Sequence, residues 1–133
     1  MKLSKELAPK LKPWIEKHKP QLVILFGSAV HGMPGPEPDL DLAVFFGHKV
    51  DEYLVLTDLN HTLERDDTDI MFLDHAEPIA RMSASRGEVI YEDRAGRMER
   101  FVSISHREFM DHDKFFKMRR ELNQEFLDQR VSK

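Results

Sequence analysis

The chain has 133 residues and a formal net charge of −4 at pH 7, with 41% hydrophobic and 33% charged residues. This length suits about one ordinary domain, and the composition is typical of a globular protein with its own core. We therefore expect a single domain over residues 1–133. The acidic balance argues against a general nucleic-acid binder, because phosphate backbones recruit proteins with clustered lysine and arginine.

The sequence carries no sign of export or of a membrane span. No apolar run approaches the roughly 20 residues that cross a bilayer. The first residues lack the apolar core of a secretion signal, and the chain contains no cysteine, whereas disulfides are typical of oxidising compartments. We therefore expect a cytoplasmic protein without membrane association.

Helical spacing and a short apolar run organise the first third of the chain. A first helix is predicted by Leu3, Leu7, Leu11 and Ile15. Ser4 can cap it, and Pro9 and Pro13 are expected to break or kink it, so we predict a bent helix. Residues 22–26 predict a strand that ends in a turn at Gly27, and the proline-rich segment 33–38 predicts a stiff loop.

The rest of the chain predicts alternating strands and helices. A second strand is expected over 40–46, and a third over 68–73. A helix with Asp51 as its cap and Val55 and Leu59 on its apolar face lies between them. A helix over 78–86 and a short strand over 88–91 follow. From residue 94, phenylalanines on a charge-rich background predict one long helix or two in succession, packed on the sheet, on a second copy or on a partner.

A glycine turn and three aspartates form the main candidate site. Ten residues separate Ser28 from Asp39, and Asp41 follows two positions later. On an extended strand both carboxylates project from the same face, where they can bridge a hard cation. Asp69 on a neighbouring strand can complete the site and accept a proton from an attacking hydroxyl.

Small residues at the turn suit a bound phosphate. Gly27 lets the backbone approach the β- and γ-phosphates, and the Ser28 hydroxyl and nearby amides can donate hydrogen bonds to them. Carboxylate-bound Mg²⁺ beside a triphosphate is the arrangement that nucleotidyl transfer requires. Of the other carboxylates, Asp66 and Asp67 are expected in the preceding turn, and Asp74 is a weaker competitor for Asp69.

The motif Leu25-Phe26-Gly27-Ser28, followed after ten residues by Asp39-x-Asp41, resembles the polymerase-β-type nucleotidyltransferase superfamily. The resemblance covers residues 20–92 and is greatest for the minimal nucleotidyltransferase (MNT) antitoxins. Gly32 matches a later glycine of that branch, Asp69 its third aspartate and residues 89–92 its closing strand. The sequence departs from the pattern at two positions, with Pro38 where a serine is frequent and His31 where a basic residue is frequent.

The resemblance implies a fold and a function. The fold would be α/β, a small mixed sheet with helices packed largely against one face, as a core over 20–92 with a helical tail over 94–130. Asp39, Asp41 and Asp69 would bind Mg²⁺, and Gly27, Ser28 and Gly32 the nucleotide. The protein would transfer AMP from ATP to a tyrosine of a cognate HEPN ribonuclease toxin. Two alternatives remain open: an antitoxin that acts by binding alone, and a nucleotidyltransferase for a small molecule or RNA.

Overall fold

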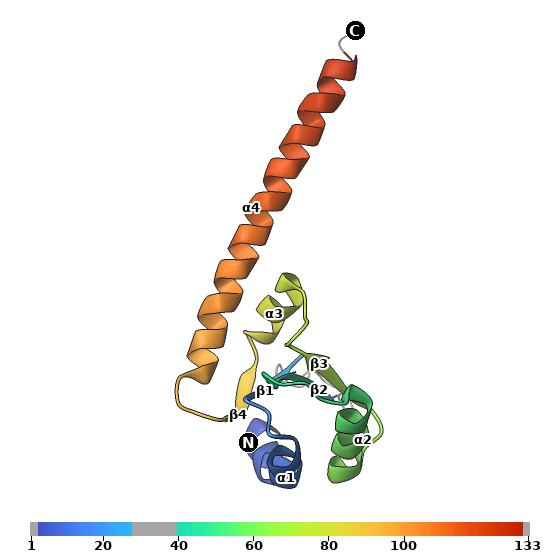
Figure 1. The fold of residues 1–133 in the computed structure, drawn as a ribbon, viewed down its shortest axis with the longest axis vertical. Helices are drawn as coiled ribbons and strands as arrows, with labels where there is room; N and C mark the ends of the chain where they lie inside the picture. Colours follow the sequence, from blue (N-terminus) through green and yellow to red (C-terminus); the bar gives the residue numbers. More distant parts are fainter. Residues whose placement is uncertain (1–2, 28–39, 132–133) are drawn as a thin grey trace.

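The computed structural model describes residues 3–27 and 40–131, with side chains described up to residue 125. Figure 1 shows a small sheet with helices above and below it and one long helix that projects away. The elements in chain order are α1 (Leu3–His18), β1 (Leu22–Phe26), β2 (Leu40–Phe45), α2 (Glu52–Leu63), β3 (Thr68–Phe72), α3 (Pro78–Ala84), β4 (Glu88–Glu92) and α4 (Arg97–Val131).

The four strands form one mixed sheet in the order β3-β2-β1-β4. β1 lies antiparallel to both β2 and β4, whereas β2 and β3 are parallel. A parallel pair needs a crossover between its strands, and α2 supplies it. The mixed sheet and the long C-terminal helix confirm the fold class that the sequence predicts.

Strand alternation divides the core into two clusters, one on each face of the sheet. On one face, α1 and α2 bury Leu11, Trp14 and Leu59 against β1 and β2. On the other face, Ala84 of α3 and Phe101 of α4 pack against the sheet. The expectation that the helices cover mainly one face is therefore wrong: two helices pack against each face.

The first helix runs through its two prolines without interruption. α1 has 16 residues and contains both Pro9 and Pro13, which are exposed. Leu7, Leu11 and Trp14 face the core, and the Trp14 indole Nε1 donates to the Val55 carbonyl oxygen at 3.0 Å. Of the two expected effects of the prolines, a break is therefore excluded, and the burial of one face outweighs the backbone hydrogen bonds that the prolines cannot make.

The ends of the helices follow local chemistry. Asp51 caps α2 as predicted, accepting a hydrogen bond from the Leu54 amide. Ser4, the expected cap of α1, lies inside that helix, and its hydroxyl donates to the Glu88 carboxylate at 2.8 Å. The C-terminal segment forms one helix of 35 residues. Among the helices of residues 3–27 and 40–131, none combines the length and hydrophobicity that crossing a bilayer requires.

Candidate active site

Two of the predicted aspartates lie side by side at one end of the sheet, near the starts of β2 and β3. Asp41 on β2 pairs in register with Asp69 on β3. Paired residues on neighbouring strands project from the same face, about 4.8 Å apart along the hydrogen-bonding direction. Asp41 is partly exposed and Asp69 exposed, so solvent reaches the position between the two strands.

Gly27 lies directly against this pair. It follows Phe26, which pairs with Asp41 across the antiparallel ladder. Its φ of +84° is in the region that favours glycine, and a Cβ at this position would lie 2.6 Å from Oδ2 of Asp41. The turn after β1 therefore holds its backbone against the Asp41 carboxylate, and only glycine permits this approach.

The structure describes three of the six predicted site residues, Gly27, Asp41 and Asp69, and brings them to the same end of the sheet. Ser28, Gly32 and Asp39 lie outside the described residues, as do His31 and Pro38. Within the described part of the chain, no group of three or more histidine, cysteine, aspartate or glutamate residues is placed to hold a metal ion. Asp41 and Asp69 bring two carboxylates to this end of the sheet.

Asp74 lies at the opposite end of the sheet and has a structural role. Its Oδ1 accepts a hydrogen bond from the Phe46 amide at 2.9 Å, and its Oδ2 accepts one from the Gly47 amide at 2.8 Å. Beside it, the Leu73 amide donates to the Val44 carbonyl oxygen. These contacts hold the end of β2 to the segment after β3, so Asp74 does not compete with Asp69 for the site.

An arginine-aspartate pair supports the loop that leads to Asp69. Asp66 and Asp67 lie between α2 and β3, as predicted. Arg65 binds Asp67 through two hydrogen bonds, Nε to Oδ1 at 2.8 Å and Nη2 to Oδ2 at 2.9 Å. The guanidinium lowers the pKa of the Asp67 carboxyl. Sequence analysis missed this pair, for which the Arg-x-Asp spacing was the available signal.

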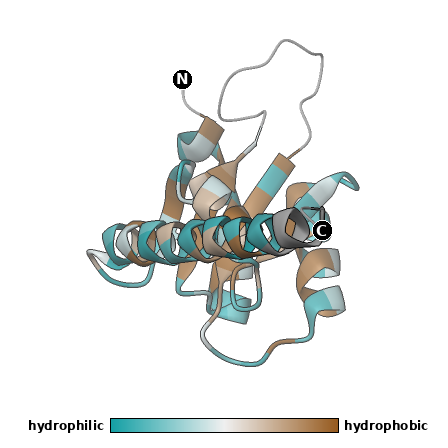
Figure 2. Cartoon of the chain, turned by 90° about the horizontal axis from the view of Figure 1, so that it is seen from above, coloured by the Kyte–Doolittle hydropathy of each residue, from teal (hydrophilic) through white to brown (hydrophobic). Residues whose placement is uncertain are grey.

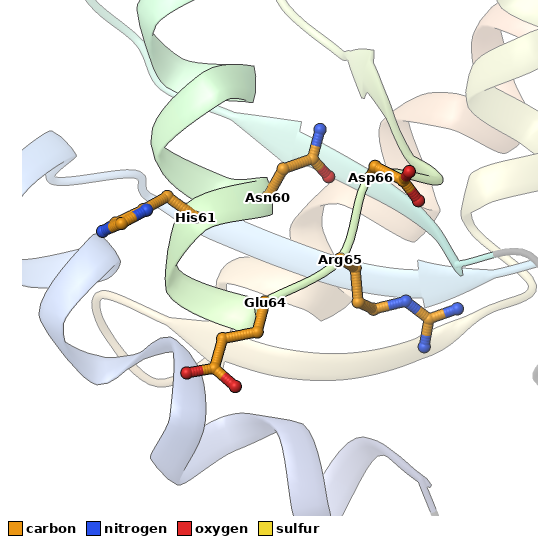
Figure 3. A pocket seen from close by; sticks show the side chains of 5 residues that line it. All are labelled: Asn60, His61, Glu64, Arg65 and Asp66. Atoms are coloured by element: carbon orange, nitrogen blue, oxygen red, sulfur yellow. The ribbon is translucent and has the colours of Figure 1, made fainter.

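The same loop borders an open hollow at the end of α2 (Figure 3). The hollow has a volume of about 570 Å³ and is lined by Asn60, His61, Glu64, Arg65 and Asp66. The Asn60 side chain accepts a hydrogen bond from the Thr68 amide at 3.3 Å, which joins α2 to the start of β3. Of the predicted site residues that the structure describes, Gly27, Asp41 and Asp69, none lines the hollow, so it adjoins the segment before Asp69 without containing the carboxylate pair.

Several solved structures with a similar fold are toxin–antitoxin complexes. One contains AMP-PNP, with a TM-score of 0.64 at 20% identity over 92% of this chain and 96% of that one. A second holds a tri-AMPylated Shewanella oneidensis HEPN toxin with an MNT antitoxin, with a TM-score of 0.61 at 18% identity over 96% and 98%. A third is the toxin–antitoxin MntA-HepT, with a TM-score of 0.60 at 18% identity over 94% and 97%.

The family comparison agrees with the fold. Among proteins of curated function, none matches the sequence. The family described as polymerase beta, nucleotidyltransferase matches residues 9–95, which run from within α1 to beyond β4 and include the whole sheet. This match confirms the superfamily that the glycine turn and the aspartate motif predict. The chain belongs to the polymerase beta nucleotidyltransferase family.

Proposed function

We propose that this protein is an MNT-type antitoxin that transfers AMP from ATP to a tyrosine of a cognate HEPN toxin in the cytoplasm. The observation that carries the proposal is the alignment of Asp41 with Asp69 beside Gly27. Family membership supports nucleotidyl transfer. The similar folds of complexes with AMP-PNP and with an AMPylated HEPN toxin support the donor and the acceptor.

The residues at this end of the sheet suit Mg²⁺. Carboxylate oxygens are the ligands that this hard cation prefers. Asp41 and Asp69 lie in register on neighbouring strands, so their side chains are close enough to bind one ion together. In this proposal Asp39 adds a third carboxylate. When bound, the ion would neutralise charge on the triphosphate and on the leaving pyrophosphate.

The residues of the glycine turn hold and orient the nucleotide. Because Gly27 has no side chain, the backbone can approach the phosphates. The Ser28 hydroxyl and the amides of the turn, including that of Gly32, donate hydrogen bonds to the triphosphate. These contacts would hold the triphosphate at the end of the sheet that carries the carboxylates.

Asp69 receives the proton of the acceptor. The tyrosine oxygen forms a bond to the α-phosphorus, the bond from that phosphorus to the bridging oxygen breaks, and pyrophosphate leaves. The phenolic proton passes to the Asp69 carboxylate, which is exposed and can release it to solvent. In this proposal the whole chain is one domain. Residues 20–92 perform the transfer, and residues 94–130 form its helical tail.

The proposal is tested by Asp41→Asn and Asp69→Asn. Each change removes a negative charge at the site without changing side-chain volume, so labelling of the purified toxin from α-labelled ATP should fall by at least about 100-fold. Asp66→Asn is the matched control, because Asp66 is exposed in the neighbouring loop. It should label at the rate of the unaltered protein, and chelation of Mg²⁺ should abolish labelling.

Three results would contradict the proposal. If Asp41→Asn labelled the toxin at the full rate, Asp41 would not belong to the catalytic site. Neutralisation of the toxin without any labelling would favour an antitoxin that acts by binding alone. Labelling of RNA or of a small molecule in the absence of toxin would show that the acceptor is that molecule and not a tyrosine of the toxin.

A further inference from the structure

Arg86 lies in the short segment between α3 and β4, and its backbone is held on both sides. Before it, Ser85 is buried, and the Ser85 hydroxyl donates to the Met82 carbonyl oxygen at 2.6 Å. After it, Gly87 lies so close to β1 that a Cβ there would collide with the Leu25 carbonyl oxygen. The Arg86 side chain itself is exposed, so a fixed backbone presents a mobile cation to solvent.

The strand registers place this segment level with the candidate site. Leu25 pairs with Glu88 in the antiparallel ladder of β1 and β4, so Gly87 comes opposite Phe26, the next residue of β1. A Cβ at Gly87 would lie 3.0 Å from that of Phe26, in agreement with this register. Phe26 in turn pairs with Asp41. Gly87 is therefore two strand spacings, or about 10 Å, from Asp41.

The two carboxylates of the site project toward the face of the sheet that α3 covers. Residues two positions apart share one face of a strand. Asp41 is two positions before Ala43 on β2, and Asp69 is two positions before Met71 on β3. Ala43 and Met71 pack in the same cluster as Ala84, the last residue of α3. The segment that leaves α3 therefore lies on the face to which the carboxylates project.

The charge of Arg86 is not neutralised by a contact within the described part of the chain. Its amide donates to the Ser83 carbonyl oxygen, but its guanidinium forms no hydrogen bond or ion pair there. By contrast, the guanidinium groups of Arg65, Arg81 and Arg97 all donate to oxygen atoms of the protein. Arg86 is thus available to an anion that binds between it and the carboxylates.

Position, rather than charge alone, distinguishes Arg86. Figure 2 shows hydrophilic residues along much of α4 as well, and Arg100 of α4 is another exposed arginine. Arg100 lines a cavity of about 190 Å³ together with Leu22 and Phe45. These two residues pair with each other at the end of β1 remote from Gly27. Arg100 therefore lies at the opposite end of the sheet from the carboxylates.

We infer that Arg86 binds the β- and γ-phosphates of the nucleotide donor. This inference rests on the proposed function, in which a triphosphate lies beside Asp41 and Asp69. A triphosphate carries more negative charge than one divalent ion neutralises, and a guanidinium offsets part of the remainder. Its paired N–H groups can donate two parallel hydrogen bonds to one phosphate. Because these two phosphates leave together as pyrophosphate, Arg86 also stabilises the charge that develops on the leaving group.

Titration calorimetry with AMP-PNP and Mg²⁺ tests the inference without the toxin and without transfer. Arg86→Ala should weaken AMP-PNP binding by about 10- to 100-fold, because hydrogen bonds between charged groups are lost. Arg86→Lys keeps the charge but not the paired N–H groups, so its affinity should lie between those of Arg86→Ala and the unaltered protein. Arg100→Ala is the matched control. It removes the same side chain from an exposed position at the other end of the sheet and should leave the affinity unchanged.

The outcomes separate this inference from the proposed function. Unchanged binding by Arg86→Ala would overturn the inference alone, as would an equal loss in Arg100→Ala, which would indicate a general effect of positive charge. An unaltered protein that does not bind AMP-PNP would overturn both. If binding depends on Arg86 but the toxin is never labelled, the inference stands and the proposed transfer to the toxin falls. Because Arg86 is exposed, both Arg86 variants should keep the urea midpoint. A loss of affinity that follows a loss of stability would assign Arg86 to the fold and overturn its role in binding.

Discussion

At the scale of single residues, the site depends on the absence of one side chain. The sequence predicts that Gly27 begins a turn, because glycine is the residue that adopts such a backbone without steric cost. It does not reveal that the space of a Cβ is occupied by Oδ2 of Asp41, 2.6 Å away. That contact arises from strand pairing between residues 26 and 41, which local patterns do not specify.

Gly27→Ala should therefore impair activity more than stability. The backbone would pay about 1–2 kcal/mol for a non-glycine residue at positive φ, and the new methyl group would displace the Asp41 carboxylate. We expect labelling of the toxin to fall by at least about 100-fold. Gly96→Ala is the matched control: Gly96 has a φ of +89°, and a Cβ there would have no neighbour within 4 Å. Gly96→Ala should lose a similar free energy of unfolding in urea and keep its activity. An equal loss of activity in both variants would show that the close approach of Gly27 to Asp41 has no special role.

At the scale of elements, most predictions from hydrophobic spacing hold. The bounds of β1 are those predicted, and Asp51 caps α2. α4 continues as one helix because no glycine or proline lies between its ends.

α1 shows the limit of prediction from residue type. Its prolines are exposed, so water can satisfy the carbonyl groups that lack an amide donor, and a rule based on residue type alone does not take the side of the helix into account.

The sequence prefers Asp69 to Asp74 for the site but does not reveal what Asp74 does, since both adjoin the same apolar run. The structure places the two apart: Asp69 pairs with Asp41, and Asp74 accepts hydrogen bonds from the amides of Phe46 and Gly47. Asp74→Ala should lower the free energy of unfolding by about 2–3 kcal/mol, because two hydrogen bonds to a charged acceptor are lost. Urea denaturation measures this loss, and Asp69→Ala should leave the unfolding midpoint almost unchanged. The reverse order of stabilities would show that the two assignments are exchanged.

At the scale of the whole molecule, carboxylates tie distant segments together. Asp58 of α2 binds Lys17 and His18 of α1 at 2.6 and 2.8 Å. The hydrogen bond from Lys17, followed by that from His18, lowers the pKa of Asp58 below its usual 3.8. Arg97 similarly lowers the pKa of Asp93 just before α4. These pairs thus join α1 to α2 and fix the entry into α4.

Stability should therefore fall in acid. A carboxyl whose pKa is lower in the folded protein stabilises the fold fully above its unfolded pKa, near 3.8 for Asp58, and the effect is lost as the pH falls through the lower folded value. We expect the urea midpoint to be constant from pH 7 to about 5 and to decline below pH 4. Asp58→Asn should decline less steeply over the same range. An identical slope in both proteins would show that Asp58 does not contribute.

The arrangement of helices over the two faces of the sheet was the main error at this scale. Apolar spacing shows that a helix has a buried side, but not which face of the sheet it covers. β1 has apolar residues on both faces, with Val23 and Leu25 in one cluster and Leu22 and Ile24 in the other. Such a strand is typical of a sheet that is covered on both sides, and the continuous apolar run 22–26 was the available signal.

The register between β2 and β3 has a consequence for how the protein tolerates change. The distance between the Asp41 and Asp69 backbones is the spacing of a hydrogen-bonded ladder, and main-chain atoms set that spacing. Exchange of one core leucine for another apolar residue leaves the ladder in place. The protein can therefore accumulate substitutions in both apolar layers while the two carboxylates keep their separation.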